Sequence, residues 1–372
     1  MEKGKKKIAI LELDNKNHSS LIYNWISVAN LNHWDLLLIT DNDLYQNVRK
    51  EVEAEQFSLF LKNGDESLPK FLWRTKQHLE KNKVDFLVVL TMQTFFIEYL
   101  IILLFSTKIG VTIHNARTWF HQNKISKPTH LLKRIIRKIW MKRASFFIVN
   151  SEAMNRYVST NFAVKKQLLV MPFSMRRSHL EKNSDAPFTV VYPGMISKTR
   201  KKYDNFLLLA ADNPDIQFVL LGSPNKKEGG DQVIEEILAK GIKNIRYFLS
   251  YIEPGEFAAH MSQSSILFTE LVIEYENSDF SEIYGITKDS GISYLMYEFA
   301  KPAFLNAEFS NLDYLREGTF YFDGASDLLA KFKNLRSDQK IMEEARENLS
   351  NSVDEVNLAF IAKKISSLNH VI

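Results

Sequence analysis

Short apolar runs alternate with amphipathic stretches along most of the 372-residue chain. The runs in the first half are rich in β-branched and aromatic residues: KIAILEL, WDLLLIT, QFSLFL, VDFLVVL, IGVTIHN, SFFIVN and LLVMPF. Continuous apolar runs of this length are typical of parallel strands that are buried on both faces and connected by crossover helices. The pattern predicts an α/β domain with a doubly wound, mostly parallel sheet over residues 1–178.

The alternation stops at residues 175–187, where the polar sequence MRRSHLEKNSDAP predicts a linker. It restarts with FTVVYPG, IQFVLLG, IRYFLS, SILFTEL, PAFLN and TFYFD, and helices are expected near 202–212, 231–240, 254–263, 290–300 and 325–335. A second Rossmann-like domain is therefore predicted over residues 187–352, facing the first across a cleft. Apolar spacing from Val353 to Leu368 predicts a last helix within residues 353–372, which could cross back to the first domain.

One apolar stretch, Phe86–Thr107, is long enough to span a membrane. It contains Glu98, and a charge within a span costs a few kcal/mol. A buried strand followed by a buried helix fits this stretch better. The basic residues at the start of the chain are followed closely by the acidic residues Glu12 and Asp14, so we expect a first strand there and not a secretory signal.

Composition excludes several classes of site. The chain has no cysteine, which excludes disulfides, zinc–thiolate sites, iron–sulfur clusters and a cysteine nucleophile, and it favours a reducing compartment such as the cytoplasm. The 48 Lys and Arg against 44 Asp and Glu are too balanced for a surface devoted to nucleic acid. No glycine lies in the loop DNKNHSS after the first predicted strand, so no NAD or FAD cofactor is expected.

The same loop carries polar side chains that could hydrogen-bond a polyol. They are Asn15, Asn17, His18, Ser19 and Ser20. They could also be solvated, and either serine could cap the following helix. After the second predicted strand, Asp41-Asn42-Asp43 has the D-x-D form that holds a divalent cation in some sugar transferases, but these residues are also common in turns and caps. We expect a turn or cap there, and no metal site.

A basic loop follows the first strand of the second domain. It reads YPGMISKTRKKYD, and its four cations, Lys198, Arg200, Lys201 and Lys202, lie within five positions before a helix. Cations at a helix N-terminus suit an anion such as a diphosphate, although a solvated basic loop is the alternative. The place of the loop at the carboxyl end of a strand favours a ligand site.

The order of these segments resembles the GT-B glycosyltransferases, in particular the large retaining family 4. The matching series is IHN, SFFIVNSEAM, VMPFS, YPG-x6-KKYD, VLLGS, SILFTEL and FAKPAFLN, and it covers nearly the whole chain. The resemblance implies transfer of a sugar from a nucleotide-sugar in the second domain to a hydroxyl acceptor held mainly by the first. It also implies retention of anomeric configuration, no metal requirement and closure of the cleft on binding.

Carried over residue by residue, the resemblance implies that Arg200 and Lys201 bind the donor diphosphate and that His114 lies close to the donor sugar. Further donor contacts are expected from Gly194, Lys198, Gly222, Asp289, Ser290 and Gly291. Acceptor contacts are expected from His18, Ser19, Ser20 and Asn115. The segment Glu274–Asp289 is interpreted as a long, functional loop.

Two positions depart from the family pattern. Met195 occupies the position of the family's first arginine, and Leu295 occupies the position of a glutamate that would hydrogen-bond the donor ribose. Glu274 and Glu282 have the expected separation of eight, but they lie upstream of the helix start and are no counterpart. Two alternatives therefore stay open: a GT-B-fold non-catalytic partner or glycan-binding subunit, and a nucleotide-sugar epimerase.

Residues 124–143 hold eight Lys and Arg and no acid. A predicted helix carries an apolar stripe and, on its other sides, Lys133, Arg134, Arg137 and Lys138; the stripe is Leu131, Leu132, Ile135, Ile136, Ile139 and Trp140. Basic amphipathic helices bind anionic membrane surfaces, although the stripe could simply pack on the sheet, and the two interpretations are compatible. We expect a cytoplasmic enzyme, peripheral on the inner face of the membrane, that acts on a glycan or lipid-linked glycan in bacterial surface polysaccharide synthesis.

Overall fold

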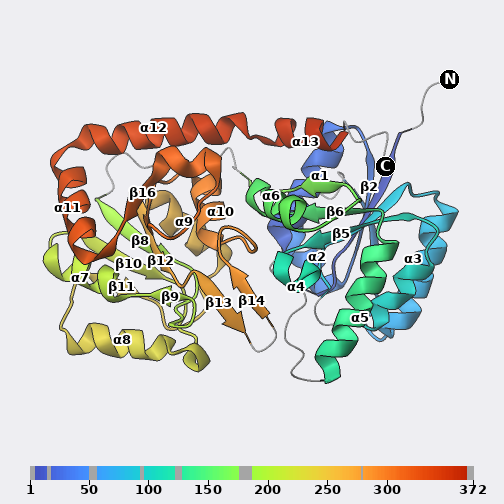
Figure 1. Ribbon diagram of the computed structural model, residues 1–372, viewed down its shortest axis with the longest axis horizontal. Helices are drawn as coiled ribbons and strands as arrows, with labels where there is room; N and C mark the ends of the chain where they lie inside the picture. The colour runs from blue at the N-terminus through green and yellow to red at the C-terminus, as the bar shows by residue number, and fades with distance from the viewer. Residues whose placement is uncertain are drawn as a thin grey trace. The chain divides into compact units, whose positions relative to one another are not determined.

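The computed structural model describes residues 5–14, 18–49, 57–92, 96–121, 128–175, 187–277 and 280–366. The chain forms two compact units, coloured along the sequence in Figure 1. The first comprises Met1–Met175, Asn277–Ser281 and Asn357–Ile372, and the second comprises Arg176–Glu276 and Glu282–Val356. Most of the predicted linker, and Asn15 and Asn17 of the first loop, lie outside the described residues.

All seven apolar runs of the first unit form strands of one parallel sheet. They are β1 (Lys7–Leu11), β2 (Asp35–Thr40), β3 (Ser58–Leu61), β4 (Phe86–Val89), β5 (Lys108–Ile113), β6 (Phe146–Val149) and β7 (Leu168–Val170). The strand order is β3-β2-β1-β4-β5-β6-β7, and Leu11 of β1 pairs with Ile39 on one side and Val89 on the other. The order changes direction between β1 and β4, which makes this the switch point of the sheet.

The helices of the first unit begin at polar residues or turns. They are α1 (Ser19–Leu31), α2 (Asn42–Val48), α3 (Leu68–Lys81), α4 (Ala116–Phe120), α5 (Pro128–Arg143), α6 (Glu152–Asn161) and α13 (Leu358–Ser366). The Asp41 side chain accepts a hydrogen bond from the backbone N–H of Leu44 and caps α2, which confirms the cap interpretation of the D-x-D triplet. The last helix, α13, packs on α1, where Asn32 Nδ2 donates to the Ala362 carbonyl oxygen at 3.1 Å.

The helix expected after β4 is shorter and tighter than the sequence predicts. It is a 3₁₀ helix, η2 (Glu98–Leu104), with Tyr99 and Ile102 buried. Among the described residues, no helix has both the length and the apolar character needed to cross a membrane.

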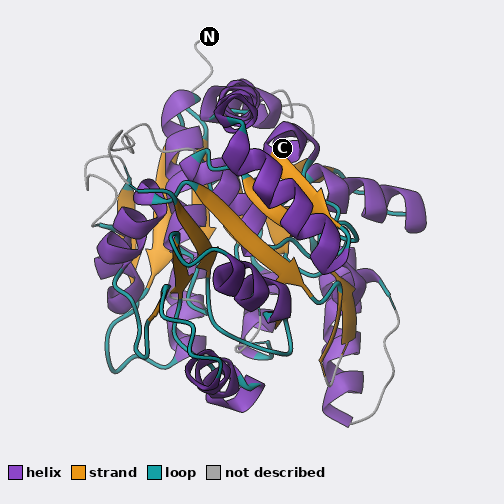
Figure 2. Ribbon diagram, turned by 90° about the vertical axis from the view of Figure 1, so that its left-hand side faces the viewer, coloured by secondary structure: helices purple, strands orange, loops and turns teal. Residues whose placement is uncertain are grey.

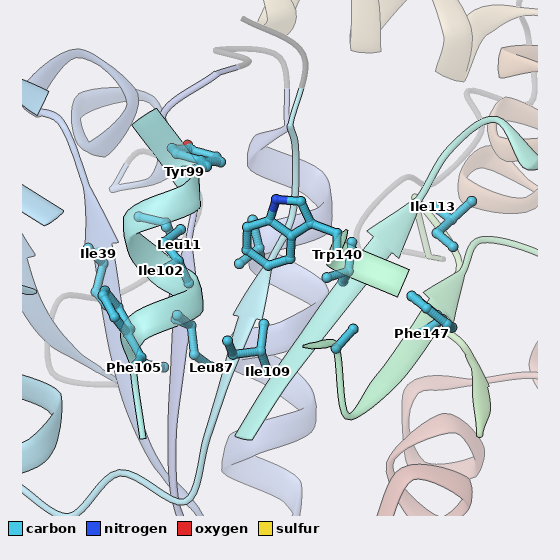
Figure 3. Packing of buried hydrophobic residues seen from close by; sticks show 14 of the residues in the cluster. Leu11, Ile39, Leu87, Tyr99, Ile102, Phe105, Ile109, Ile113, Trp140 and Phe147 are labelled. Carbon is cyan, nitrogen blue, oxygen red and sulfur yellow. The ribbon is translucent and has the colours of Figure 1, made fainter. Parts of the chain in front are cut away.

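The core of the first unit includes only part of the stripe predicted on α5. Figure 3 shows the Trp140 ring among Ile102, Ile109 and other core residues, and Ile136 is buried too. The remaining four residues of the stripe are exposed. The alternative that the stripe simply packs on the sheet is therefore wrong for these four residues and holds for Ile136 and Trp140, which are part of the core.

The second unit has the second predicted parallel sheet. Its strands are β8 (Thr189–Pro193), β10 (Gln217–Leu221), β11 (Ile245–Tyr247), β12 (Ile266–Leu271), β15 (Ala303–Asn306) and β16 (Thr319–Phe322), in the order β11-β10-β8-β12-β15-β16. Its helices are α7 (Asp204–Asp212), η3 (Lys226–Glu228), α8 (Gly230–Ala239), α9 (Pro254–Gln263), α10 (Gly291–Phe299), η4 (Asp313–Gly318), α11 (Gly324–Ser337) and α12 (Gln339–Glu355). Figure 2 shows the strands flanked by helices, and the switch point of this sheet lies between β8 and β12.

Three elements of the second unit differ from the sequence prediction. Lys201 and Lys202, where a helix was expected to begin near residue 202, form a short strand, β9 (Lys201–Lys202), which runs antiparallel to β12. The segment interpreted as a loop contains the hairpin of β13 (Glu274–Asn277) and β14 (Phe280–Ile283). The helix α12 was not predicted, and it takes the first residues of the expected last helix, so that α13 begins only at Leu358.

Candidate functional site

Each sheet places polar residues at the carboxyl ends of the strands beside its switch point. In the first unit, Glu12 follows β1 and Thr91 follows β4. In the second unit, the basic loop follows β8. Open α/β sheets bind ligands at this edge because the connections that leave the two neighbouring strands run to opposite faces of the sheet and leave a crevice between them. The two edges are therefore the candidate sites.

Glu12 organises the edge of the first unit. Its carboxylate is fully buried and accepts hydrogen bonds from Thr91 Oγ1 at 2.6 Å and from the Asp14 backbone N–H at 2.8 Å. The Nδ1 atom of His18 lies 2.9 Å from Glu12 Oε2 and 2.8 Å from Thr91 Oγ1. Because Thr91 gives its own proton to Glu12, both oxygens can only accept from His18, and Nδ1 is assigned as the donor.

His114 lies beside this group, with its ring centroid 5.1 Å from that of His18. Its Nε2 is 2.9 Å from the Leu90 carbonyl oxygen and its Nδ1 is 2.8 Å from Asn150 Oδ1. Burial, and next the neighbouring His18, lower the pKa of His114 to about 4, although both hydrogen bonds act in the opposite direction. His114 is thus neutral at pH 7, so only one of its two nitrogens carries a proton and donates to one of these oxygens.

The other predicted acceptor residues lie at the same edge. His18 itself occupies the N-cap position of α1, so the alternative that Ser19 or Ser20 caps this helix is wrong; both serines lie in its first turn. Asn115 occupies the N-cap position of α4 and is nearly buried. The structure therefore gathers His18, His114 and Asn115 around one strand edge, and their contact with an acceptor stays a prediction. The sequence did not single out Glu12 or Thr91 as site residues.

Two glycines shape the basic loop of the second unit. Gly194 follows β8 with a φ of +84°, a conformation that favours glycine. A Cβ atom on Gly222, which follows β10, would lie 2.4 Å from the Gly194 carbonyl oxygen. The loops after β8 and β10 can therefore approach this closely only because Gly222 lacks a side chain.

Lys201 is hydrogen-bonded to the backbone of this loop. Its Nζ donates to the carbonyl oxygens of Pro193 at 2.7 Å and Met195 at 3.2 Å, and it lies 5.1 Å from the centroid of the Tyr192 ring. Burial, and next the charge of Arg200, lower the pKa of Lys201 to about 7. The ammonium group is bonded to neutral carbonyls, so an anion at this loop would stabilise its charged form.

Arg200 is paired with Glu228, which the sequence did not single out. Arg200 Nη2 lies 3.2 Å from Glu228 Oε1, and the guanidinium stacks over the Tyr275 ring at 5.3 Å. Glu228 also accepts hydrogen bonds from the hydroxyls of Ser197 and Thr199. Burial by itself would raise the pKa of Glu228, but the Ser197 bond and the Arg200 charge hold it below its ordinary value. A carboxylate thus binds the arginine and hydroxyls that could hold a phosphate.

The remaining predicted donor residues surround this loop less tightly. Lys198 is held through its backbone, whose N–H donates to the Glu228 carbonyl oxygen at 2.8 Å, while its side chain is exposed. Ser290 is the N-cap residue of α10 and Gly291 its first residue, as predicted. Asp289 accepts a hydrogen bond from Tyr294 Oη at 2.6 Å, which leaves less of its carboxylate for a ligand.

The departures from the family pattern have a structural counterpart. Leu295 lies within α10, so an aliphatic side chain stands where a ribose-binding glutamate was expected. Glu282 is fully buried on β14 whereas Glu274 is exposed on β13, and the two do not form a matched pair. Lys288, which the sequence did not single out, lies close enough to Arg200 for that charge to act with burial in lowering the Lys288 pKa. It adds a cation beside the basic loop.

Comparison with known proteins supports the resemblance seen in the sequence. Residues 36–172 match the family model of Glycosyltransferase Family 4. A search of curated proteins finds no match. Among solved structures, sucrose-phosphate synthase from Thermosynechococcus elongatus is 13% identical with a TM-score of 0.66, and 98% of each chain is covered.

Two further structures bear on the choice of activity. HepE from Anabaena, solved with UDP and glucose, is 14% identical with a TM-score of 0.67, covering 99% of this chain and 100% of its own. A UDP-N-acetylglucosamine 2-epimerase is 10% identical with a TM-score of 0.52, covering 92% of this chain and 91% of its own. At these identities the likeness concerns the fold. The predicted fold, two Rossmann-like units as in GT-B glycosyltransferases, is confirmed.

Proposed function

The chain has the GT-B fold, and its first unit is similar to Glycosyltransferase Family 4. We propose that it is a glycosyltransferase that takes its sugar from a nucleotide-sugar. The donor binds the second unit and the hydroxyl acceptor binds the first. The observation that carries the proposal is the basic loop after β8, which places Arg200, Lys201 and Lys198 at the switch point where open α/β sheets bind ligands. UDP and glucose in the similar HepE structure support a nucleotide-sugar donor.

The chemistry assigned to the loop is stabilisation of the departing diphosphate. Negative charge grows on the leaving group as the glycosidic bond to it breaks, and preorganised cations lower the barrier most where that charge develops. Two exchanges accompany donor binding. Arg200 leaves Glu228 for the phosphates, and Lys201 gains a proton as it meets an anion. We propose retention of configuration and no metal requirement, in line with the family resemblance.

The acceptor proposed is a glycan or lipid-linked glycan of bacterial surface polysaccharide synthesis, used at the inner face of the cell membrane. At the strand edge of the first unit, the buried Glu12 holds His18, and His18 packs against His114. Such a preorganised group suits the positioning of a sugar hydroxyl, because rotamers locked by hydrogen bonds lose little entropy on binding.

A nucleoside diphosphate panel tests the donor site. Binding to the folded chain raises its stability by about 2.7 kcal/mol at a ligand concentration of 100 times Kd, so we expect a higher Tm with at least one nucleotide. Sugar transfer or donor hydrolysis should then fall in Lys201→Ala. Equal turnover in this variant and the wild type would overturn the phosphate role of Lys201.

The same panel separates the two competing functions. The likeness to UDP-N-acetylglucosamine 2-epimerase makes an epimerase one alternative. An epimerase would isomerise the sugar of its nucleotide without any acceptor. The departures from the family pattern at Met195 and Leu295 make a non-catalytic partner the other alternative. Such a partner would give no Tm shift with any nucleoside diphosphate. A nucleotide-dependent Tm shift together with acceptor-dependent release of diphosphate is the result expected of a glycosyltransferase.

A further inference from the structure

The helix α5 exposes most of its apolar stripe. The exposed fractions are 45% for Leu131, 45% for Leu132, 48% for Ile135 and 42% for Ile139. We name these four residues the docking surface. Figure 1 shows the first turns of α5 projecting beyond the sheet of their unit.

The four exposed residues of α5 share one side of the helix. At about 100° per residue they fall within an arc of about 100°, next to the buried row of Ile136 and Trp140. Arg134, Lys138 and Lys142 follow one another at intervals of four and form a row along the opposite border of this arc. An exposed apolar arc bordered by cations is the arrangement of helices that lie in the interface of a membrane.

The helix is anchored to η2 by side chains that are not part of the docking surface. Arg143 donates to the carbonyl oxygens of Leu103 at 3.2 Å and Phe105 at 2.5 Å. The Arg137 guanidinium lies 5.6 Å from the centroid of the Phe96 ring. With Trp140 buried beneath them, these contacts present the apolar arc on a fixed support.

Charge selects the partner of the docking surface. Lys133, Arg134, Lys138 and Lys142 form no ion pair with any residue that the structure describes, and Lys138 and Lys142 are exposed. Glu98 is the one acid in the sequences of η2 and α5. A neutral apolar partner would leave these cations unmatched, whereas an anionic lipid bilayer offers both negative headgroups and an apolar interior.

We propose that the docking surface inserts its four apolar side chains into an anionic lipid bilayer, with the row Arg134, Lys138 and Lys142 at the headgroups. This deepens the proposed function, because it rests on that function for the acceptor: a lipid-linked acceptor would be met at the bilayer. Binding by insertion has a component that salt does not screen, and it therefore differs from simple attraction of a basic helix to a charged surface.

Flotation of the purified full chain with vesicles tests this proposal. Wild type should bind phosphatidylglycerol vesicles at low salt, bind phosphatidylcholine vesicles far less, and keep part of its binding to phosphatidylglycerol at about 0.5 M salt. The double variant Leu132→Ser/Ile135→Ser should bind at least about tenfold more weakly, a change of about 1.4 kcal/mol. Lys138→Glu should weaken binding mainly at low salt.

Matched controls lie on the second unit. Leu238, on α8, is 64% exposed, and Lys243 is exposed on the loop that follows. Leu238→Ser and Lys243→Glu should leave vesicle binding unchanged. Absence of wild-type binding, or equal losses in the control variants, would overturn the proposal.

Two further measurements make the outcome specific. Sedimentation without lipid shows whether a second copy of the chain covers the docking surface: a dimer that the double variant abolishes would overturn the bilayer in favour of self-association. The nucleoside diphosphate Tm shift should be the same in the double variant and the wild type. A chain that binds vesicles but no nucleotide would refute the proposed function alone, and one that binds nucleotide but no vesicles would refute the docking surface alone.

Discussion

Protonation of Lys201 offers a quantitative test of the donor site. Its Nζ donates to two carbonyl oxygens, and burial, followed by the charge of Arg200, lowers its pKa to about 7. At pH 8, about one tenth of the free protein therefore carries the charged form. An anion about 4 Å away contributes about 4 kcal/mol at an effective dielectric constant of about 20, enough to raise the pKa by about three units. Binding of a nucleoside diphosphate at pH 8 should therefore take up about 0.9 proton.

Isothermal titration calorimetry measures this uptake directly. The observed heat, plotted against the ionisation enthalpy of several buffers, has a slope equal to the number of protons bound. The choice of pH 8 keeps the terminal phosphate, whose second pKa is about 6, fully ionised before and after binding. Uptake should disappear in Lys201→Met and persist in Lys202→Met, the exposed neighbour on β9. A wild-type slope near zero, or one equal to that of Lys201→Met, would refute contact between Lys201 and the diphosphate.

Three other predictions follow from the geometry. Glu228→Gln removes the charge that holds Arg200. Because partly exposed ion pairs contribute about 0.5–1 kcal/mol, nucleoside diphosphate binding should tighten about two- to fivefold. An unchanged Kd by calorimetry would contradict the exchange of Arg200 from Glu228 to the phosphates. Gly222→Ala places a Cβ atom 2.4 Å from a backbone oxygen and should lower the free energy of unfolding by about 1–3 kcal/mol in urea titrations, so full stability would refute the close approach. His114 has a pKa of about 4 against an ordinary 6.5, so the unfolded chain binds more protons between these values and stability should fall as pH drops from 6.5 to 4, by at most about 3 kcal/mol. His114→Gln should flatten that part of the stability profile, and an unaltered slope would show that another group titrates there.

Secondary structure was predictable where it depends on local pattern. Every apolar run identified in the sequence forms a strand, because a strand buried on both faces needs apolar residues at consecutive positions. The cap at Asp41 and the start of α10 after Ser290 are likewise local properties. The helix α12 could also have been predicted, since its buried residues Met342, Ala345, Leu349 and Val353 have helical spacing.

Short elements were not predictable from pattern. The two residues of β9 form a strand only because β12 lies beside them and pairs with them, and no periodicity exists over two positions. The hairpin of β13 and β14 was hidden by its acidic composition, which is typical of a loop. In both cases pairing with a neighbouring strand overrides local preference.

The sequence by itself therefore determined the two doubly wound sheets, their order along the chain and the positions of the basic loop and the basic helix. Tertiary structure alone decided which charges meet and which apolar residues are covered. Arg200 and Glu228 are 28 positions apart, and Glu12 and Thr91 are 79 apart, so only folding brings each pair together. Periodicity placed the apolar stripe on one side of α5, but packing against the core of the first unit decided that Ile136 and Trp140 would be buried and the rest exposed. Burial depends on what a neighbouring element covers, and one segment of sequence carries no information about its neighbour's position.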